Sequence, residues 1–529
     1  MAIKNKAIAA VTCGLSLAMT LGGPLSAIPA YAATVNINQD QAGQTVSGRT
    51  FNAYKIATYT TDADGGHIYT FVNAEARTAV RDALMGLGVD LDGVTTDVSL
   101  AGKISTLGAS DQAKFAKAMA EKLADPIAIN GNTATLDDNA YYVVEETTAE
   151  DKVVKAAPFL IETETGELKV TLKSNQPNID KVIVDGKNNK FDDTSIGKDV
   201  KFQLNDMTVP NTYGYDSFTY TINDKMSAGL TLSKAQLDAM VVAIGGQPVE
   251  AGTDTYTVLV KQGNDWVEAN TLDSKWSADG AEFQIKFKPT YFIGNYDSGT
   301  YAQTPAAGST ITVDFAATLN SKAEVVKPEN NTTSLTYTNK PNSTTDSTEH
   351  KVYVYTFGIE VNKTFSDNKN LFSQVEFGIT GTNGVIYVTG DNGDYTVCKQ
   401  GDTGAKDASA GLKLDSNGKF MIKGLDEGTY TVKETKTPDG YKSNGDQTIK
   451  INPHYGDGNV DGIAGKTITV DSDANNNGYV DGAIVNSPNT FQLPLTGDAG
   501  MFLLPAAGLG IMGVVLVVSS KKKLNKTDE

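Results

Sequence analysis

The sequence has 529 residues, with 63 Asp and Glu against 45 Lys and Arg, a formal charge of −18, and only two Cys and three His. Such an acidic chain is a poor partner for nucleic acid, because affinity for phosphate comes from clusters of Lys and Arg. The few Cys and His leave little material for a metal site, so we expect no metal and no cofactor. The length allows about three domains, and the many Tyr and Gly favour a mainly β fold rich in turns.

The first 32 residues predict a secretory signal peptide. Two lysines precede an apolar stretch over residues 7–21, and residues 30–32 read Ala-Tyr-Ala, a small-residue cleavage site. Gly-Gly-Pro at 22–24 interrupts the apolar stretch before it is long enough to span a bilayer. We therefore expect an exported chain whose mature part begins at Ala33.

Short runs of alternating apolar and polar residues, broken by Gly, Asn and Asp, follow the signal peptide and predict antiparallel β-sandwiches. Residues 73–87 and 110–123 instead carry apolar residues three or four apart and predict helices in the first domain. A further short helix is expected around 233–242. The fold class is therefore mainly β. We expect three tandem immunoglobulin-like sandwiches between the signal peptide and the carboxyl-terminal region described below.

Clusters of turn-forming residues and prolines mark the expected domain boundaries. We expect a signal peptide, three domains and a sorting region, and their bounds are 1–32, 33–175, 176–345, 346–490 and 491–529.

The carboxyl terminus combines a short motif, an apolar run and a basic tail. Residues 499–518 are apolar and uncharged, long enough to span a bilayer, and lysines follow at 521–523 and 526. The motif immediately before them is Leu493-Pro494-Leu495-Thr496-Gly497. This order resembles the cell-wall sorting signal of Gram-positive surface proteins. The resemblance implies that a sortase cuts after Thr496 and transfers its carbonyl to an amine, which leaves a mature chain with a net charge of about −21.

One strand of the third domain places a carboxylate on a face that should be buried. Tyr430, Val432 and Glu434 share that face at period 2. A buried carboxylate must be protonated or bonded, and Lys363 in the first strand and Asn486 in the last could both reach it. The three could form an amide between lysine and asparagine with the acid as proton shuttle, or a buried ion pair beside a turn-capping asparagine.

The segment from Tyr430 to Tyr441, Tyr-x-Val-x-Glu-Thr-x-x-Pro-x-Gly-Tyr, resembles the E-box of the backbone pilins of Gram-positive bacteria. The resemblance implies a collagen-adhesin B-type (CnaB) third domain with a Lys363–Asn486 isopeptide promoted by Glu434. The middle domain resembles that of the same pilins. There the implied amide joins Lys181 to Asn339 with Asp224 as the acid.

Two further positions are suggested with less support from the pattern. Asp216 is the alternative acid of the middle domain. The first domain repeats Tyr-x-Val-x-Glu-Thr around Glu146, with Lys55 as an available lysine, but it lacks the Pro-x-Gly-Tyr half. Glu146 is therefore interpreted as structural, with a third isopeptide through Lys55 as the alternative.

A polymer also needs an acceptor amine. The resemblance to backbone pilins places it at the end of the first domain, where Lys173 stands eight residues before Lys181. Lys169 is the competing candidate. The Asp- and Asn-rich runs within 457–482 resemble the start of calcium loops, but they lack the spacing of an EF-hand and are interpreted as hairpin loops.

Together these features predict a structural protein and not an enzyme. It would be the shaft subunit of a covalent pilus on a Gram-positive cell wall, supporting adhesion and joined through Thr496 and Lys173. The implied partners are a class C pilin sortase, a housekeeping sortase, other copies of the chain, ancillary pilins and peptidoglycan, with a host receptor or matrix protein as candidate ligand. The alternative is a monomeric wall-anchored adhesin or an ancillary pilin that binds a host protein or glycan.

Overall fold

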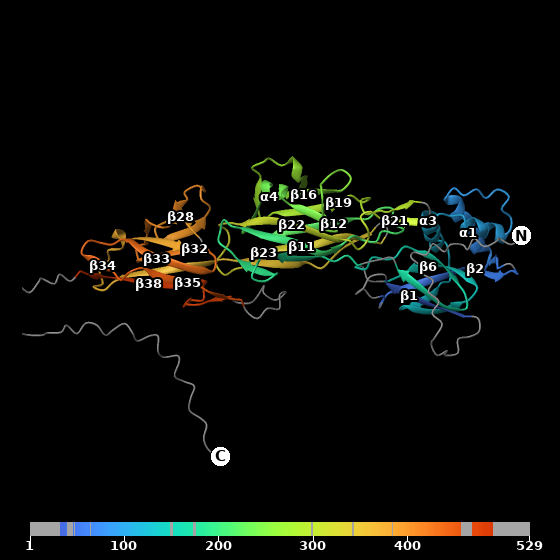
Figure 1. Cartoon of the computed structure of the whole chain (residues 1–529), viewed down its shortest axis with the longest axis horizontal. Coiled ribbons are helices and arrows are strands. Elements are labelled where there is room, and N and C mark those ends of the chain that lie inside the picture. The colour runs from blue at the N-terminus through green and yellow to red at the C-terminus, as the bar shows by residue number, and fades with distance from the viewer. Residues whose placement is uncertain are drawn as a thin grey trace, which may run out of the picture. The chain divides into compact units, whose positions relative to one another are not determined.

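The computed structural model describes residues 32–39, 46, 48–63, 65–148, 152–172, 176–297, 300–340, 343–382, 384–455 and 468–489. In these residues strands far outnumber helices (Figure 1), so the expected mainly β fold is confirmed. Residues 1–31 of the expected signal peptide, Lys173 and the sorting motif lie outside the described residues. Among the residues that are described, no helix is long and apolar enough to cross a membrane.

The first domain contains two sheets. The smaller has the order β5 (Thr133–Asp137), β1 (Ala32–Gln39) and β8 (Gly166–Leu172). The larger has the order β3 (His67–Phe71), β2 (Thr50–Thr61), β6 (Ala140–Glu146) and β7 (Phe159–Thr163), with β4 (Ile127–Asn130) also paired to β2.

Three helices in the first domain follow from periodic apolar residues and local capping. α1 (Ala74–Gly86) and α3 (Ala109–Ala120) match the two predicted helices. α2 (Asp97–Ile104) was not predicted, although Thr96 and Ser99 form a capping box at its start. The helices bury residues such as Val80 and Leu100 in the same core as the inner face of the larger sheet.

The middle domain is a sandwich of two large sheets. One has the order β15 (Gln247–Val249), β14 (Val241–Ile244), β22 (Thr310–Leu319), β11 (Asp199–Thr208) and β9 (Asp180–Ile183), with β13 (Leu230–Ser233) and β18 (Ser277–Asp279) attached. The other has the order β10 (Phe191–Asp193), β25 (His350–Tyr355), β23 (Glu329–Lys340), β12 (Tyr220–Met226), β19 (Glu282–Phe287), β16 (Tyr256–Gln262) and β17 (Asp265–Glu268), with β24 (Ser343–Asp346) paired to β23.

Short elements complete this domain. The helix expected around 233–242 is α4 (Lys234–Asp238), which ends before the strand β14 begins. A small hairpin is formed by β20 (Asn295–Asp297) and β21 (Thr300–Ala302), and η1 (Ala269–Thr271) is a 3-10 turn.

The junction after the middle domain differs from the expected boundary at residue 345. β24 and β25 both pair with β23, so residues 343–355 complete the middle domain's sheet. Only Thr356 separates β25 from the first strand of the third domain, and its hydroxyl donates to the carbonyl of Leu425 at 3.0 Å. The turn-rich residues near 345 form a tight connection within a sheet and do not link two domains.

The third domain is also a sandwich. One sheet has the order β30 (Lys406–Asp407), β28 (Tyr387–Asp391), β29 (Asp394–Cys398), β32 (Lys419–Leu425), β26 (Phe357–Phe365), β38 (Tyr479–Pro488) and β34 (Tyr441–Ser443). The other has the order β31 (Leu412–Lys413), β27 (Glu376–Gly381), β33 (Gly428–Lys436) and β35 (Gln447–Ile451). β36 (Pro453–His454) pairs with β37 (Thr469–Val470), and η2 (Phe372–Gln374) is a 3-10 turn.

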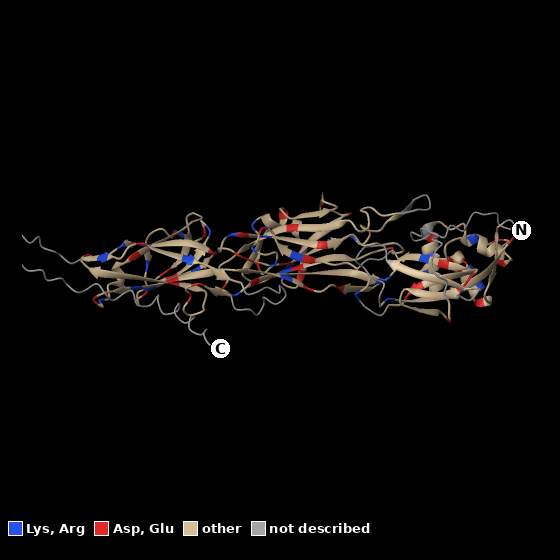
Figure 2. Cartoon of the chain, turned by 60° about the horizontal axis from the view of Figure 1, so that its bottom comes forward, with Lys and Arg blue, Asp and Glu red and all other residues tan. Residues whose placement is uncertain are grey.

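Charged residues are found in all the described domains, with Lys and Arg interspersed among the more numerous Asp and Glu (Figure 2). Most charges are exposed, as expected for a solvated acidic surface. A small set of charged side chains is instead buried inside the sandwiches, among them Lys181, Asp224 and Lys363. These exceptions locate the candidate sites.

Candidate crosslinking sites

In the third domain the first and last strands are neighbours, as the sequence analysis assumed. β26 pairs with β38 in parallel, with Lys363 opposite Ile484 and Phe365 opposite Asn486. Lys363 is 1% exposed and Asn486 is fully buried. The Lys363 ammonium nitrogen donates to the carbonyl of Thr364 at 2.9 Å and contacts that of Ile484 at 3.4 Å. The Lys363 side chain therefore points toward β38, the strand that carries Asn486.

Glu434 reaches the same place from the other sheet. It lies on β33, and its Oε1 accepts a hydrogen bond from Asn486 Nδ2 at 2.6 Å. Tyr430 and Val432, which share its face, are buried as predicted. The structure thus brings together the lysine, acid and asparagine that the sequence analysis proposed for this domain.

The electrostatics of the third-domain site make Lys363 easier to deprotonate than a lysine in water. Burial lowers the pKa of Lys363 to about 8, although the nearby Glu434 opposes this shift. The ammonium also lies 4.6 Å from the centre of the Phe365 ring. Two buried oxygens, Oε2 of Glu434 and Oδ1 of Asn486, have no hydrogen-bond partner. Such atoms are rare in folded proteins, and one of them is the oxygen of the Asn486 carbonyl that an amine would attack.

The middle domain buries a second lysine and a second acid. The Lys181 ammonium is bonded to Asp224 Oδ2, and both side chains are fully buried. Lys181 lies on β9 and Asp224 on β12, so the contact bridges the two sheets of the sandwich. Asp216, the alternative acid, is exposed and lies outside the strands. The site therefore uses Asp224.

Burial shifts both groups of this pair toward their neutral forms, and two aromatic rings lie beside the lysine. The Lys181 nitrogen lies 5.6 Å from the ring centre of Phe202 and 5.3 Å from that of Phe315. Burial raises the pKa of Asp224 and lowers the pKa of Lys181 to about 8. A neutral amine beside a protonated acid is the combination that amide formation requires.

The amide closest to this pair belongs to Asn331, which the sequence analysis did not identify. Asn331 is fully buried on β23, opposite Met226 and therefore two positions along β12 from Asp224. Its side chain faces the Asp224 carboxylate and lowers the pKa of that group, partly offsetting the effect of burial. Neither its nitrogen nor its oxygen makes a hydrogen bond of good geometry.

The structure does not bring Asn339 to this site. Thr333 is the β23 residue opposite Asp224, so Asn339 lies six residues further along the strand, a distance of about 20 Å. The Asn339 backbone carbonyl instead accepts a hydrogen bond from Lys155 N of the first domain at 2.9 Å. The expectation of a Lys181–Asn339 pair is therefore corrected, because the asparagine at the height of Lys181 and Asp224 is Asn331.

The first domain lacks such a constellation in its described residues. Glu146 is buried and accepts hydrogen bonds from Thr148 Oγ1 and Ala156 N, both at 2.7 Å. Its cationic neighbour is Arg49, at 3.4 Å. Lys55 pairs instead with Asp137, on the surface. A guanidinium is always charged and cannot act as the nucleophile of an amide-forming reaction. The contacts of Glu146 therefore indicate a structural role.

The remaining sequence candidates are placed as follows. Lys169 is exposed on β8. In the described part of the 457–482 region, Asp473 accepts hydrogen bonds from the backbone nitrogens of Asn475, Asn477 and Gly478, in the manner of a turn. No group of three or more potential metal ligands occurs among the described residues.

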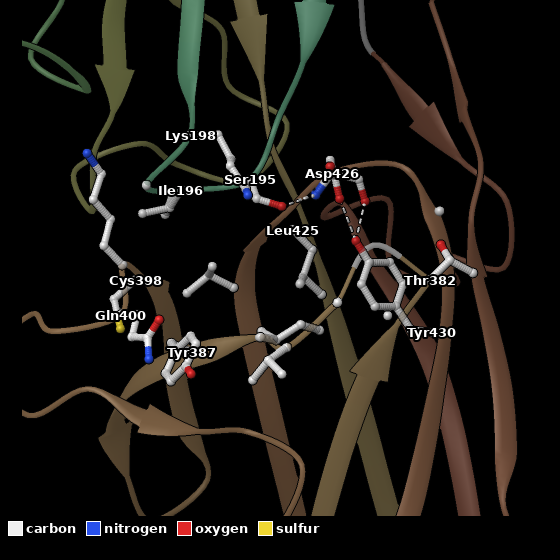
Figure 3. Close-up of a pocket in the computed structure, with 18 of the residues that line it drawn as sticks. Ser195, Ile196, Lys198, Thr382, Tyr387, Cys398, Gln400, Leu425, Asp426 and Tyr430 are labelled. Carbon is white, nitrogen blue, oxygen red and sulfur yellow. Dashed lines mark hydrogen bonds between the residues drawn. The ribbon is translucent and has the colours of Figure 1, made fainter.

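A crevice of about 310 Å³ lies between the middle and third domains (Figure 3). Asp426 N donates to Ser195 Oγ across it at 3.2 Å, and Tyr430 donates to Asp426 Oδ1 at 2.7 Å. Cys398 lines the crevice, and burial raises the pKa of its thiol. None of the crosslinking candidates lines it, so it is separate from both sites.

Two family matches agree with this geometry. Residues 357–463 match the family described as SpaA, prealbumin-like fold domain, and residues 486–526 match the LPXTG cell wall anchor motif. The first match begins at the first residue of β26, as the sheet pairing does. No curated protein is similar enough in sequence to count as a relative.

Solved pilin structures resemble the chain over most of its length. The T6 backbone pilin of Streptococcus pyogenes is 18% identical, with a TM-score of 0.45 and 80% of each chain covered. The major pilin SpaD of Corynebacterium diphtheriae is 16% identical, with a TM-score of 0.45 and 87% of this chain and 98% of SpaD covered. BcpA, the major pilin subunit of Bacillus cereus, is 16% identical, with a TM-score of 0.43 and 87% and 99% covered.

The class of the protein follows from the two family matches: it is a surface protein with a cell-wall anchor motif and a prealbumin-like β domain. More particularly, its third domain is a SpaA-type prealbumin-like domain, and its LPXTG anchor is that of a sortase substrate. These matches confirm the resemblance to Gram-positive pilins and the expected location at the cell wall.

Proposed function

We propose that the chain is the backbone subunit of a covalent pilus, polymerised by sortase and stiffened by self-formed amides in its middle and third domains. The observation that supports this proposal best is that two sandwiches of one wall-anchored chain each bury a lysine and an asparagine close to an acid. Two such buried sets have no role in a simple hydrophobic core, where ionisable groups are costly.

The proposed reaction at each site is the same. The neutral lysine amine attacks the side-chain carbonyl carbon of the asparagine, a new carbon–nitrogen bond forms, and the bond to the amide nitrogen breaks. The protonated acid donates a hydrogen bond to the carbonyl oxygen and transfers the proton that lets ammonia leave. The residues are Lys363, Glu434 and Asn486 in the third domain, and Lys181, Asp224 and Asn331 in the middle domain. Each acts once, so the chain is not an enzyme.

The amides would strengthen the domains without cysteine pairs. Counted from the residue numbers, they close loops of 150 and 123 residues. By the loop-entropy argument used for disulfides, each contributes about 5 kcal/mol through the unfolded state. A chain with two cysteines, one of them in the expected signal peptide, has no internal disulfide available for this purpose.

Polymerisation is proposed through Thr496 of one copy and Lys173 of the next. The LPXTG anchor supports the use of Thr496 as the acyl donor. Lys173 is chosen by position, since it follows β8 at the end of the first domain and precedes β9, which carries Lys181. The proposed partners are a class C pilin sortase, a housekeeping sortase for attachment to peptidoglycan, and ancillary pilins.

Intact mass spectrometry of residues 33–496 tests the amides. Two amides lower the mass by two ammonia molecules, about 34 Da. In Lys363→Ala or in Lys181→Ala one amide cannot form, so the mass, corrected for the substitution, should be lower by only one ammonia. An unshifted wild-type mass would contradict the crosslinks.

Coexpression with the cognate pilin sortase tests the polymer separately. We expect a ladder on denaturing gels that Lys173→Ala abolishes and that Lys169→Ala, the matched control, leaves intact. A protein that stays monomeric with its sortase would support the alternative, a wall-anchored adhesin.

A further inference from the structure

A groove of about 570 Å³ crosses the middle domain on the face of the eight-stranded sheet opposite to Asp224. Successive residues of a strand point to opposite sides of a sheet. Asp224 therefore faces the core, whereas Asn223 and Lys225 face the groove. Asp224 is among the residues that line the groove, but its side chain is fully buried, whereas Lys225 is exposed. The groove and the crosslinking site therefore share β12 but present the side chains of its opposite faces.

The strand register aligns one row of side chains across this face. Trp266 on β17 is opposite Lys261 on β16, and Lys225 on β12 is opposite Glu282 on one side and Thr332 on the other. Lys351 on β25 continues the row beyond Thr332. From Trp266 to Lys351 the row crosses five strand spacings, about 24 Å. The groove is therefore long enough for a chain of linked rings.

An exposed indole stands at one end of the groove. Trp266 is 40% exposed, whereas Trp276, the other tryptophan of the chain, is packed against the core. An indole has a flat apolar face with a negative potential. Such a face stacks on the C–H side of a sugar ring, whose hydrogens carry partial positive charge.

The floor of the groove consists of neutral hydrogen-bonding groups held in a fixed orientation. Gln284 Nε2 donates to Asn223 Oδ1, and Asn223 Nδ2 donates to Thr336 Oγ1, both at 2.9 Å. Amides and hydroxyls offer donors and acceptors side by side. Sugar hydroxyl groups both donate and accept, so this floor is complementary to a polyol.

The charges in the groove compensate one another. Glu282 is bonded to Lys225 and to Lys261, both at 2.8 Å, and Lys351 lies 3.4 Å from Glu349. Among the residues that line the groove, Lys225 and Lys351 are matched by Glu282 and Glu349, whereas Lys261 is not part of the lining. The lining therefore offers no excess of positive charge for a phosphate, a sulfate or a carboxylate. It also lacks the buried apolar pocket that anchors a peptide side chain.

We propose that this groove binds a neutral oligosaccharide, with Trp266 stacked on one ring and with Asn223, Gln284 and Thr332 bonded to hydroxyl groups. The inference goes beyond the role of a shaft subunit. It does not depend on the amides or on polymerisation, so it is tested on the monomer.

The test titrates monomeric residues 33–496 with maltotetraose, chitotetraose and β-1,4-galactotetraose, each to about 10 mM, and follows saturation-transfer NMR and calorimetry. We expect saturable binding of at least one of these probes, and Trp266→Ala should weaken it at least about tenfold. Trp266→Phe should retain part of the affinity, because a flat ring remains. Val385→Ala, at an exposed apolar residue of the third domain, is the matched control and should bind as the wild type does.

Three results would overturn the proposal: no binding of any of the three probes, equal binding by Trp266→Ala and the wild type, or binding confined to 3′-sialyllactose or a heparin tetrasaccharide. Thermal unfolding of each variant shows that a loss of binding does not come from misfolding. The intact mass of the same samples reports the amides independently, so failure of one proposal is distinguishable from failure of the other.

Discussion

The middle and third domains assemble the same three chemical groups in different ways. In the third domain Lys363 and Asn486 lie on neighbouring strands of one sheet, and the acid Glu434 comes from the other sheet. In the middle domain the acid Asp224 and Asn331 lie on neighbouring strands of one sheet, and Lys181 comes from the other. The proposed amide chemistry therefore depends on three side chains meeting at one height between the two sheets, and not on a particular strand order.

The two arrangements leave different lengths of chain outside the proposed amide. In the third domain Asn486 stands two residues before the end of β38, so almost the whole last strand lies within the closed loop. In the middle domain Asn331 is the third residue of β23, and residues 332–355, which complete β23 and include β24 and β25, follow it. A pulling force would therefore load 24 residues of the middle domain outside its crosslink.

The largest expected difference between the two domains is mechanical. Under tension the middle domain should release residues 332–355, an extension of up to roughly 80 Å, while the third domain should show no step of that size. Single-molecule force spectroscopy on residues 33–496 measures the step. In Asn331→Ala the step should lengthen several-fold, because the whole domain can then unfold. An unchanged step in that variant would contradict the assignment of Asn331.

The second prediction separates Asn331 from Asn339 by stability. Asn331→Ala should raise the mass by about one ammonia relative to the wild type, after allowing for the substitution, and lower the free energy of unfolding by about 5 kcal/mol. Asn339→Ala, the matched control on the same face of β23, should keep the wild-type loss of ammonia. Mass spectrometry and denaturant unfolding check both variants. The opposite pattern would restore Asn339 as the partner.

The third prediction concerns pH in the third domain. In Asn486→Ala the amine of Lys363 stays free, with a pKa lowered from 10.5 to about 8 in the folded state. The unfolded state then binds more protons between these values, so the free energy of unfolding should rise with pH from about 8 to 10.5, by at most about 3 kcal/mol.

The wild type is the control for this pH dependence, since an amide nitrogen does not titrate in this range. Chemical denaturation at several pH values measures the slope for both proteins. A variant whose stability is flat or falls over this pH range would show that Lys363 is not held in a dry site.

The smallest effect is expected in the first domain. Lys55 forms an ion pair with the exposed Asp137, and surface pairs contribute about 0–1 kcal/mol. Lys55→Ala should therefore change the free energy of unfolding by less than about 1 kcal/mol and leave the intact mass free of any ammonia shift. If the mass of Lys55→Ala, corrected for the substitution, were higher than that of the wild type by one ammonia, the first domain would contain a third amide. The contrast with the other two domains would then disappear.

Local patterns were sufficient to predict much of the fold. The period-2 runs gave the mainly β sandwiches, and the spacing of apolar residues gave α1 and α3. α2 was missed because it has only eight residues, although the capping box of Thr96 and Ser99 was visible in the sequence. The boundary near 345 was misplaced because turn-forming residues mark hairpins and linkers alike.

In the candidate sites, too, local sequence patterns predicted some residues and could not choose between others. Period 2 determined that Glu434 shares a buried face with Val432, and the order of the strands along the chain was enough to pair Lys363 with Asn486. In the middle domain the resemblance to backbone pilins implied the lysine, the acid and an asparagine on the strand that became β23. Asn331 and Asn339 lie on the same face of that strand, so alternation alone could not choose between them.

The amino-acid sequence by itself thus predicted an export signal, which stays a prediction, and determined the wall anchor, the β class and the alternation of side chains along each strand. These features depend on composition and on neighbours along the chain. Only the tertiary structure decided the height at which facing strands meet. It placed Asn331 beside Lys181 and Asp224, Arg49 beside Glu146, and Trp266 at the end of a polar row. The register between strands distant in sequence is set by the packing of the two sheets, and no local pattern encodes it.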